Sequence, residues 1–256
     1  MEPILFFFTL YLISFFCNFL SALSGGGAGL LQLPALLFLG LPFPLALSTH
    51  KIASVALGIG ATLRHLRNQT FRGKIVLPVL LFGLPGVFVG SQIALDVEPR
   101  LLTLLLGIST ILISFLSQSN KYNIIETTNS GEIASKRFIL GSCVLLAIGV
   151  FNGSLASGSG LFVTYTLVKI FRLSYTEAIA TTMVLVGFFW NGTGALMLSL
   201  DTKVQWPWLI PLFLGSFTGG YSGAHFGILK GSNYVKKSFE ILTLIVGFSL
   251  LLKSLP

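Results

Sequence analysis

Three adjacent polar residues, Thr49, His50 and Lys51, interrupt a long apolar stretch of the chain. They fall six to eight residues into a helix that would start near Pro44, roughly 10 Å from its first residue. An ammonium attracts anions, and an imidazole exchanges protons near neutral pH. We therefore predict that Lys51 and His50 draw an anion into a cavity, with Thr49 as polar lining. The alternative is that Lys51 extends to the mouth of the helix, while His50 is a hydrogen-bonded packing residue.

Two glycine clusters are the second candidate feature. Each adjoins an apolar segment, at 30–40 and at 160–170, and a helix of about 11 residues is only ~16 Å long. We expect a broken helical hairpin at each cluster, whose free backbone N–H groups face a buried anion. The predicted donors share this apex position and are Gly27, Gly29, Gly158 and Gly160, with the hydroxyl of Ser159. The alternative is that these glycines only permit close helix packing.

The composition indicates that these residues lie in a lipid bilayer. The chain has 256 residues, of which 54% are hydrophobic and only 9% are charged, and its mean hydropathy is +0.89. Soluble domains carry roughly 25% charged residues, and so few charges could not coat a soluble surface of this size. We therefore predict an all-α, polytopic integral membrane protein and exclude a soluble enzyme.

The sequence indicates no other chemistry. The net charge of +8 is not gathered into a basic patch with exposed aromatic residues, so nucleic acid is not an expected partner. Cys17 and Cys143 lie in apolar segments without metal-ligand spacing, so neither a metal nor another cofactor is predicted. The sequence contains no nucleophile–base arrangement with a buried acid and no phosphate-binding loop. We expect no enzymatic activity.

The apolar segments fall into two groups of five, separated by the most polar stretch of the chain. They lie at about 4–23, 30–40, 44–65, 75–95, 100–117, 138–156, 160–170, 174–198, 206–229 and 238–255. We predict about 8–10 transmembrane segments. The first repeat is expected at 1–117, a polar cytoplasmic linker at 118–137 and the second repeat at 138–256.

The two groups of segments resemble each other in sequence. Residues 20–31 align with residues 151–162 without a gap, which brings the two glycine clusters into register. With one inserted residue, 40–49 then aligns with 172–181. Two Gly-x-x-x-Gly motifs also align further on, Gly86 to Gly90 and Gly219 to Gly223. The chain is therefore predicted to be an internal duplication.

Loop charges predict that the two repeats are inverted. Basic residues dominate the loops at 66–73 and 230–237, whereas the corresponding loops of the other half, at 201–204 and 96–99, lack this excess. Lysine and arginine in short loops mark the cytoplasmic side. Corresponding loops therefore lie on opposite faces, which places the linker inside and both termini outside.

All eight acidic residues lie in loops or near segment ends, so no carboxylate is expected at mid-membrane depth. This weakens a mechanism with a buried acid as sodium ligand or proton relay and leaves His50 as the predicted proton carrier. In the second half, the residues that match His50 and Lys51 are the uncharged Thr182 and Met183, so any cationic site is asymmetric. The further polar lining is predicted to be Asn152, Thr181 and Asn191.

These motifs resemble those of the TauE/SafE family of membrane transporters, also called the sulfite exporter family. The matching elements are the run Gly25-Gly-Gly-Ala-Gly-Leu-Leu-Gln-Leu-Pro34, the element Ser48-Thr-His-Lys-Ile52, where the family has Ala-Thr-Asn-Lys-Leu, and the run Phe151-Asn-Gly-Ser-Leu-Ala-Ser-Gly-Ser-Gly160. The similarity covers nearly the whole chain apart from the linker. It implies transport of sulfur-containing anions, such as sulfite, sulfoacetate and related organosulfonates, across the bacterial inner membrane.

The sequence departs from this family pattern at several positions. Family members often carry an acid where this chain has Ser21 and Asn152, and an asparagine where it has His50. A lysine-containing element found in the second half of some relatives is replaced by Thr181-Thr-Met-Val184. The coupling that those acids serve therefore does not transfer to this chain residue by residue.

The function expected from these features is secondary transport of a small, sulfur-containing anion by alternating access around a midplane site between the two hairpins. An anion channel on the same fold and a non-transporting membrane scaffold are the alternatives. The expected partners are a small anionic substrate and the lipid bilayer, with a homodimer as a further option. The expected location is the inner (plasma) membrane.

Overall fold

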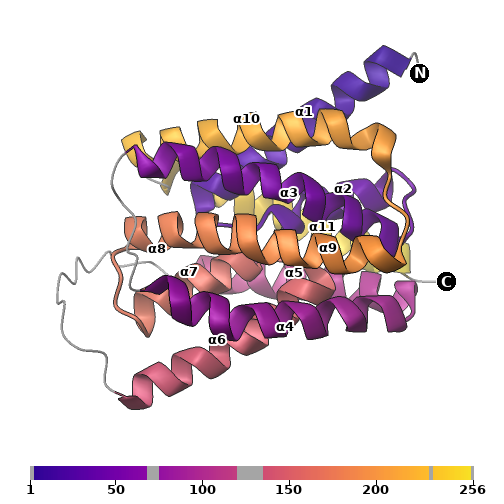
Figure 1. Ribbon diagram of the computed structural model, residues 1–256. Helices are drawn as coiled ribbons and strands as arrows, with labels where there is room; N and C mark the ends of the chain where they lie inside the picture. The colour runs from indigo at the N-terminus through magenta and orange to yellow at the C-terminus, as the bar shows by residue number, and fades with distance from the viewer. Residues whose placement is uncertain (1–2, 68–74, 120–134, 231–232, 255–256) are drawn as a thin grey trace.

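The computed structural model describes residues 3–67, 75–119, 135–230 and 233–254, which form a bundle of helices (Figure 1). In chain order these are α1 (Pro3–Ser24), the 3-10 helix η1 (Ala28–Leu30), α2 (Gln32–Phe38), α3 (Phe43–Leu66), α4 (Val76–Asp96), α5 (Pro99–Ser119), α6 (Ser135–Leu155), α7 (Ser159–Lys169), α8 (Tyr175–Thr182), the π-helix η3 (Met183–Trp190), α9 (Asn191–Asp201), α10 (Trp206–Lys230) and α11 (Asn233–Ser254). The described residues contain no strand, which confirms the predicted all-α class.

Each predicted apolar segment corresponds to a helix whose ends differ from the expected ones by a few residues. The segment predicted at 174–198 is a continuous helical run of α8, η3 and α9. Its central part is π-helical, a rare geometry that occurs mostly at functional sites. Most of the predicted linker, 118–137, and the loop at 68–74 lie outside the described residues.

Large apolar side chains cover the outside of the bundle. Leu77 on α4, Ile139 on α6, Ile210 on α10 and Ile245 on α11 are all exposed. A soluble protein rarely exposes apolar surface on this scale, because water solvates it poorly. The described helical runs that are long and apolar enough to cross a bilayer are Ile4–Ser24, Val76–Asp96, Pro99–Leu116, Lys136–Leu155 and Tyr175–Asp201. These properties are those of a multi-pass membrane protein.

Glycines bring two pairs of helices into backbone contact. They are Gly215, Gly219 and Gly223 on α10, which face α1, and Gly86 and Gly90 on α4, which face α6. Along each pair the contacts advance in the same direction, so α1 runs parallel to α10 and α4 runs parallel to α6. A β-carbon at Gly90 would lie 2.0 Å from the carbonyl oxygen of Val150, so no larger residue fits without separating the helices.

Helix α3 packs antiparallel to the run of η3 and α9 through the middle of the bundle. Near the centre of this pair, Gly58 of α3 contacts the backbone of Gly187. Nearer the start of α3, Lys51 lies against Gly194. From the first contact to the second, the residue number falls along α3 and rises along the run of η3 and α9. The two therefore run in opposite directions, as Figure 1 also shows.

Helices α5 and α11 form a second antiparallel pair. Hydrogen bonds join them from Arg100 Nε to the Ser254 carbonyl, over 2.9 Å, and from Ser114 Oγ to the Glu240 carbonyl, over 2.7 Å. The largest group of buried apolar side chains includes residues of this pair and also of α1, α2, α3, α4, α6, α9 and α10. Both chain ends lie at the same end of the bundle (Figure 1).

Candidate functional site

Both glycine clusters break regular helix inside the bundle. Between α1 and η1, the glycines 25–27 have φ angles of 87°, 122° and 110°. Between α6 and α7, Gly158 has a φ of 64°. These angles lie in the left-handed region, which glycine enters without the steric penalty of a β-carbon. The glycines therefore let the chain leave the helix without this penalty, whereas Ala156 of the second break adopts a left-handed φ of 54° despite its β-carbon.

The two breaks lie against each other. A β-carbon at Gly26 would lie 2.7 Å from the Cα atom of Gly160. Thr164 of α7 donates a hydrogen bond from Oγ1 to the carbonyl of Gly25, over 2.7 Å. Close packing at these glycines therefore brings the two breaks together.

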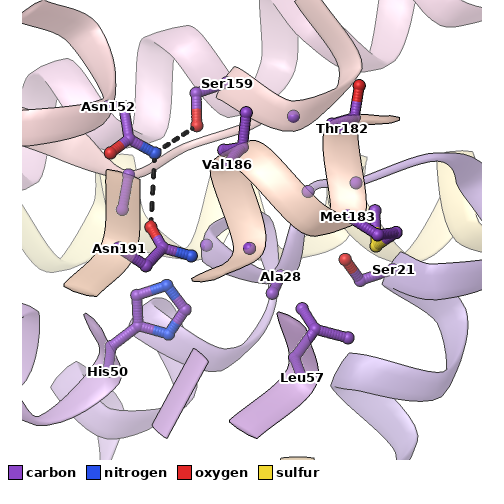
Figure 2. A pocket seen from close by; sticks show the side chains of 16 residues that line it. Ser21, Ala28, His50, Leu57, Asn152, Ser159, Thr182, Met183, Val186 and Asn191 are labelled. Atoms are coloured by element: carbon purple, nitrogen blue, oxygen red, sulfur yellow. Dashed lines mark hydrogen bonds between the residues drawn. The ribbon is translucent and has the colours of Figure 1, made fainter. Parts of the chain in front are cut away.

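A small buried cavity lies where the two breaks meet (Figure 2). Its volume is about 30 Å³, which is enough for a group the size of a water molecule. Its walls come from α1, η1, α3, α6, α7, α8, η3 and α9, so both halves of the chain contribute. Any ligand bound here would contact both halves at once.

One wall of the cavity is polar. The side-chain amide of Asn152 donates to Ser159 Oγ over 2.7 Å and, more weakly, to Asn191 Oδ1 over 3.4 Å (Figure 2). Behind this wall, Lys51 Nζ donates to Asn152 Oδ1 over 2.8 Å. The Lys51 side chain is fully buried, and within the described part of the chain this is its one hydrogen bond and no carboxylate pairs with it. A buried ammonium in such a position favours an anion nearby.

His50 continues this wall from α3. Its Nδ1 atom lies 2.9 Å from Oε1 of Gln32, and Ser54 Oγ lies 3.3 Å from each ring nitrogen. The imidazole therefore borders the cavity on one side and contacts buried polar side chains on the other. Such a residue can connect the cavity to a hydrogen-bond network.

The opposite wall is mostly apolar, with Leu57 and Met183 among its residues (Figure 2). Ser21 is the exception, and Figure 2 shows it near Met183, on the side away from Asn152. The Ser21 hydroxyl is fully buried and has no hydrogen-bond partner among the described residues. Leaving a buried hydroxyl unpaired costs about 1–3 kcal/mol, so this group is available to a ligand.

Most of the residues predicted for the site converge on this cavity. Those that line it are Gly27, Gly29, His50, Asn152, Ser159, Gly160 and Asn191. Lys51 lies directly behind Asn152, and Gly158 stands at the start of α7, against Ile113.

Thr49 and Thr181 are not brought to the cavity. Thr49 Oγ1 instead accepts a hydrogen bond from the backbone N–H of Gln205, over 3.3 Å. The Thr181 hydroxyl is buried and has no partner in the described structure. Consecutive residues of a helix point about 100° apart, so Thr49 cannot share the direction of His50.

Several residues at the site were not predicted from the sequence. Ser21 and Met183 line the cavity, and Gln32 holds the His50 ring. The sequence did mark Ser21 and Met183, because the internal alignment matches them with the predicted site residues Asn152 and Lys51. No such signal marks Gln32, whose partners Ser14 and His50 lie on the neighbouring helices α1 and α3.

Comparison with known proteins places this site in a family. Residues 10–250 match the family model described as sulfite exporter TauE/SafE. No solved structure matches the chain.

Curated relatives match over nearly their full length. A probable membrane transporter protein ORF9 of Sinorhizobium sp. is 26% identical, covering 94% of this chain and 91% of its own. The probable membrane transporter protein YfcA of Escherichia coli K12 is 24% identical, covering 96% and 89%. YdhB of Bacillus subtilis 168, with the same description, is 26% identical, covering 94% and 97%. These names point to a transporter rather than an enzyme, and the chain belongs to the sulfite exporter TauE/SafE family.

Proposed function

We propose that the protein is a secondary transporter that carries a small, sulfur-containing anion, such as sulfite, sulfoacetate or another organosulfonate, across the inner (plasma) membrane. The observation that carries this proposal is the buried ammonium of Lys51 behind the cavity wall, which no carboxylate neutralises within the described residues. The family is named for sulfite export, which supports the substrate class.

The cavity offers an anion several hydrogen-bond donors besides this charge. The Lys51 ammonium lies behind Asn152 and does not line the cavity, so it acts on an anion there through its charge. The unpaired hydroxyl of Ser21 is a further donor on the opposite wall. Charge-assisted hydrogen bonds to an anion are about twice as strong as neutral ones, so these groups favour an anionic ligand over a neutral one of similar size.

The start of α7 adds backbone donors. Its first backbone hydrogen bond runs from the Phe162 N–H to the Gly158 carbonyl, over 3.2 Å. The N–H groups of Ser159 and Gly160 precede this bond and have no acceptor within the helix. Both residues line the cavity, and the positive end of the helix dipole lies there. These features support the predicted role of the glycine breaks as anion-binding hairpins.

Helix packing supports the proposal that the two halves are inverted repeats. The internal alignment matches α1 with α6, α4 with α10, α5 with α11, and α3 with the run from α8 to α9. Corresponding helices that contact each other are antiparallel, as in α3 with α9 and α5 with α11. The parallel pair α1–α10 corresponds to the parallel pair α6–α4, because α1 matches α6 and α10 matches α4. A two-fold axis in the membrane plane has these consequences, and it allows alternating access by movement of the halves around the cavity.

The test is uptake by the purified protein in liposomes loaded with buffer, with sulfite, thiosulfate, sulfoacetate and chloride offered in turn. We expect saturable uptake of at least one sulfur-containing anion, and its loss in Lys51→Met. Flux that rises linearly with concentration would indicate a channel instead. Absence of flux for every anion, with folded protein in the liposomes, would favour a membrane scaffold.

A further inference from the structure

A chain of buried hydrogen bonds leads from the backbone of α10 to His50. It starts at the carbonyl oxygen of Leu212, which lies 2.6 Å from Ser14 Oγ. A carbonyl oxygen carries no proton, so the Ser14 hydroxyl must be the donor in this bond. A hydroxyl has a single proton, and Ser14 Oγ can therefore only accept hydrogen bonds from its other neighbours.

This bond fixes the orientation of the Gln32 side chain. Gln32 Nε2 lies 2.9 Å from Ser14 Oγ, and this atom must be the amide nitrogen because Oγ can only accept. The amide oxygen Oε1 then faces His50, 2.9 Å from its Nδ1 atom. An amide oxygen also only accepts, so His50 Nδ1 must carry a proton. The position of one backbone carbonyl thus determines which imidazole nitrogen is protonated.

The surrounding side chains hold this arrangement in place. Asn18 Nδ2 donates to the backbone carbonyl of Ser14 over 2.7 Å and to Ser216 Oγ over 2.9 Å. The hydroxyls of Ser14 and Ser216 are 2.9 Å apart, and since Ser14 has no proton left, Ser216 donates. The network therefore has one consistent direction, and reversing the Gln32 amide would place two donors or two acceptors against each other.

We infer that Gln32 is the positioning residue of His50, because it holds the imidazole proton on Nδ1 and makes Nε2 the atom that gains and loses a proton at the cavity. Ser54 Oγ lies 3.3 Å from Nε2, and a hydroxyl can donate to the neutral ring or accept from the protonated one. A proton delivered by water that enters the cavity would add to the Nε2 lone pair, and it would return to water when it leaves. The ring therefore becomes a cation without turning.

The charges around His50 link this proton to the anion. Lys51 is the charged side chain that acts on it, from the same helix. The described groups that face His50 and the cavity from other elements are uncharged, namely Gln32 on α2, Asn152 on α6, Ser159 on α7, Thr182 on α8 and Asn191 on α9. Protonation of His50 places a second positive charge beside Lys51. This is unfavourable when the cavity is empty and becomes favourable when an anion occupies it. Because such coupling is reciprocal, proton and anion strengthen each other's binding. This last step rests on the proposed function, whereas the protonation of Nδ1 does not.

Nitrogen NMR of the full-length protein, labelled with 15N-histidine in lipid nanodiscs, tests the assignment. The His50 signals are identified by their loss in His50→Asn, and the spectrum is recorded at alkaline pH, where imidazoles are neutral. We expect a proton on Nδ1 and none on Nε2. A proton on Nε2 in the wild-type protein would overturn the inference, whether or not any anion is transported.

Variants of the network separate positioning from a general structural role. Gln32→Leu removes the acceptor of the His50 Nδ1 proton, and Ser14→Ala lets the Gln32 amide turn round. Each variant should therefore populate the form of His50 that is protonated on Nε2. If Gln32→Leu does not fold, Ser14→Ala provides the test. Ser48→Ala is the control, because that hydroxyl is on the same helix and bonds only backbone carbonyls in the described structure. Gln32→Glu should extend the charged form of His50 to higher pH, and with it the anion binding measured by titration of sulfite at several pH values. An unchanged Nδ1 proton in both Gln32→Leu and Ser14→Ala, or an unchanged pH profile in Gln32→Glu, would refute the role of Gln32.

Discussion

The ammonium of Lys51 and the side-chain amide of Asn152 lie 2.8 Å apart and join the first half of the chain to the second. The family resemblance implies an acid at the position of Asn152 in many relatives, and a carboxylate there would neutralise the lysine. An asparagine accepts the hydrogen bond without cancelling the charge, so a protonated Lys51 would give the site a net positive charge beside the cavity. The chain thereby combines a buried cation with neutral side chains that are suited to a small anion.

Replacing Lys51 should weaken anion binding strongly. We expect Lys51→Met to raise the dissociation constant about 10- to 100-fold, because a hydrogen bond to a charged group contributes about 1.5–3 kcal/mol. Lys51→Arg should retain part of the affinity, because it keeps the charge. Lys169→Met is the control for loss of a lysine, because Lys169 is the exposed last residue of α7 and does not line the cavity, and it should bind nearly as the wild type does. Isothermal titration of each folded variant with the transported anion measures the effect, and wild-type affinity in Lys51→Met would leave the glycine breaks as the binding groups.

His50 should govern the pH dependence of binding. A protonated imidazole adds a positive charge at the cavity wall, so affinity for the anion should be higher at acidic pH and fall as the ring loses its proton. His50→Asn cannot change its charge, and its affinity should vary less with pH. His225→Asn serves as the control, because His225 accepts a hydrogen bond from Arg64 over 2.8 Å and does not line the cavity. Equal pH profiles for His50→Asn and the wild type, measured by substrate titration, would exclude this role.

The contact between the two glycine breaks should be required for transport. A β-carbon at Gly160 would lie 2.9 Å from Gly26 Cα, so Gly160→Ala must push the breaks apart and distort the cavity. We expect transport per folded molecule to fall at least tenfold. Gly192→Ala is the matched control on α9, because its nearest neighbour, Val55 Cγ2, would be 3.9 Å away. Similar specific activities of the two variants in liposomes would show that the breaks need not touch.

The sequence was sufficient to predict the helices but not the partners of the site residues. Apolar periodicity and length locate each helix, because a bilayer requires about 20 apolar residues for each crossing. The importance of Lys51 could be predicted because charge is rare in such a helix. Its bond to Asn152 could not, because the two residues are far apart in the chain and meet only through helix packing. Gln32 was missed for another reason, because an isolated amide in a helix carries no pattern even though His50 is only 18 residues away.

Glycines on the helix faces should affect folding rather than transport. A β-carbon at Gly223 would lie 2.3 Å from the carbonyl oxygen of Phe19, and one at Gly90 would lie 2.0 Å from that of Val150. We expect Gly223→Ala and Gly90→Ala to lower the free energy of unfolding by about 1–3 kcal/mol, the usual cost of overpacking. Gly227→Ala, one turn further along α10, has its nearest neighbour at 3.6 Å and should be neutral. Thermal unfolding in detergent measures the loss of stability. The specific activity of the remaining folded protein should stay close to that of the wild type.

The last prediction concerns the orientation of the two halves. Helices α3 and α9 are antiparallel, so the loop that follows α3 and the loop that follows α9 should open on opposite sides of the membrane. We expect the first of these loops in the cytoplasm, because it has an excess of basic residues. With Cys17 and Cys143 replaced by serine, single cysteines at 66–73, in the linker at 118–137 and at 230–237 should be shielded from an impermeant thiol reagent in intact cells. Cysteines at 96–99 and 201–204 should react, and all positions should react in opened membranes, which controls for accessibility. Equal labelling of 66–73 and 201–204 in intact cells would contradict the inverted arrangement, and with it the route by which one cavity could open to either side in turn.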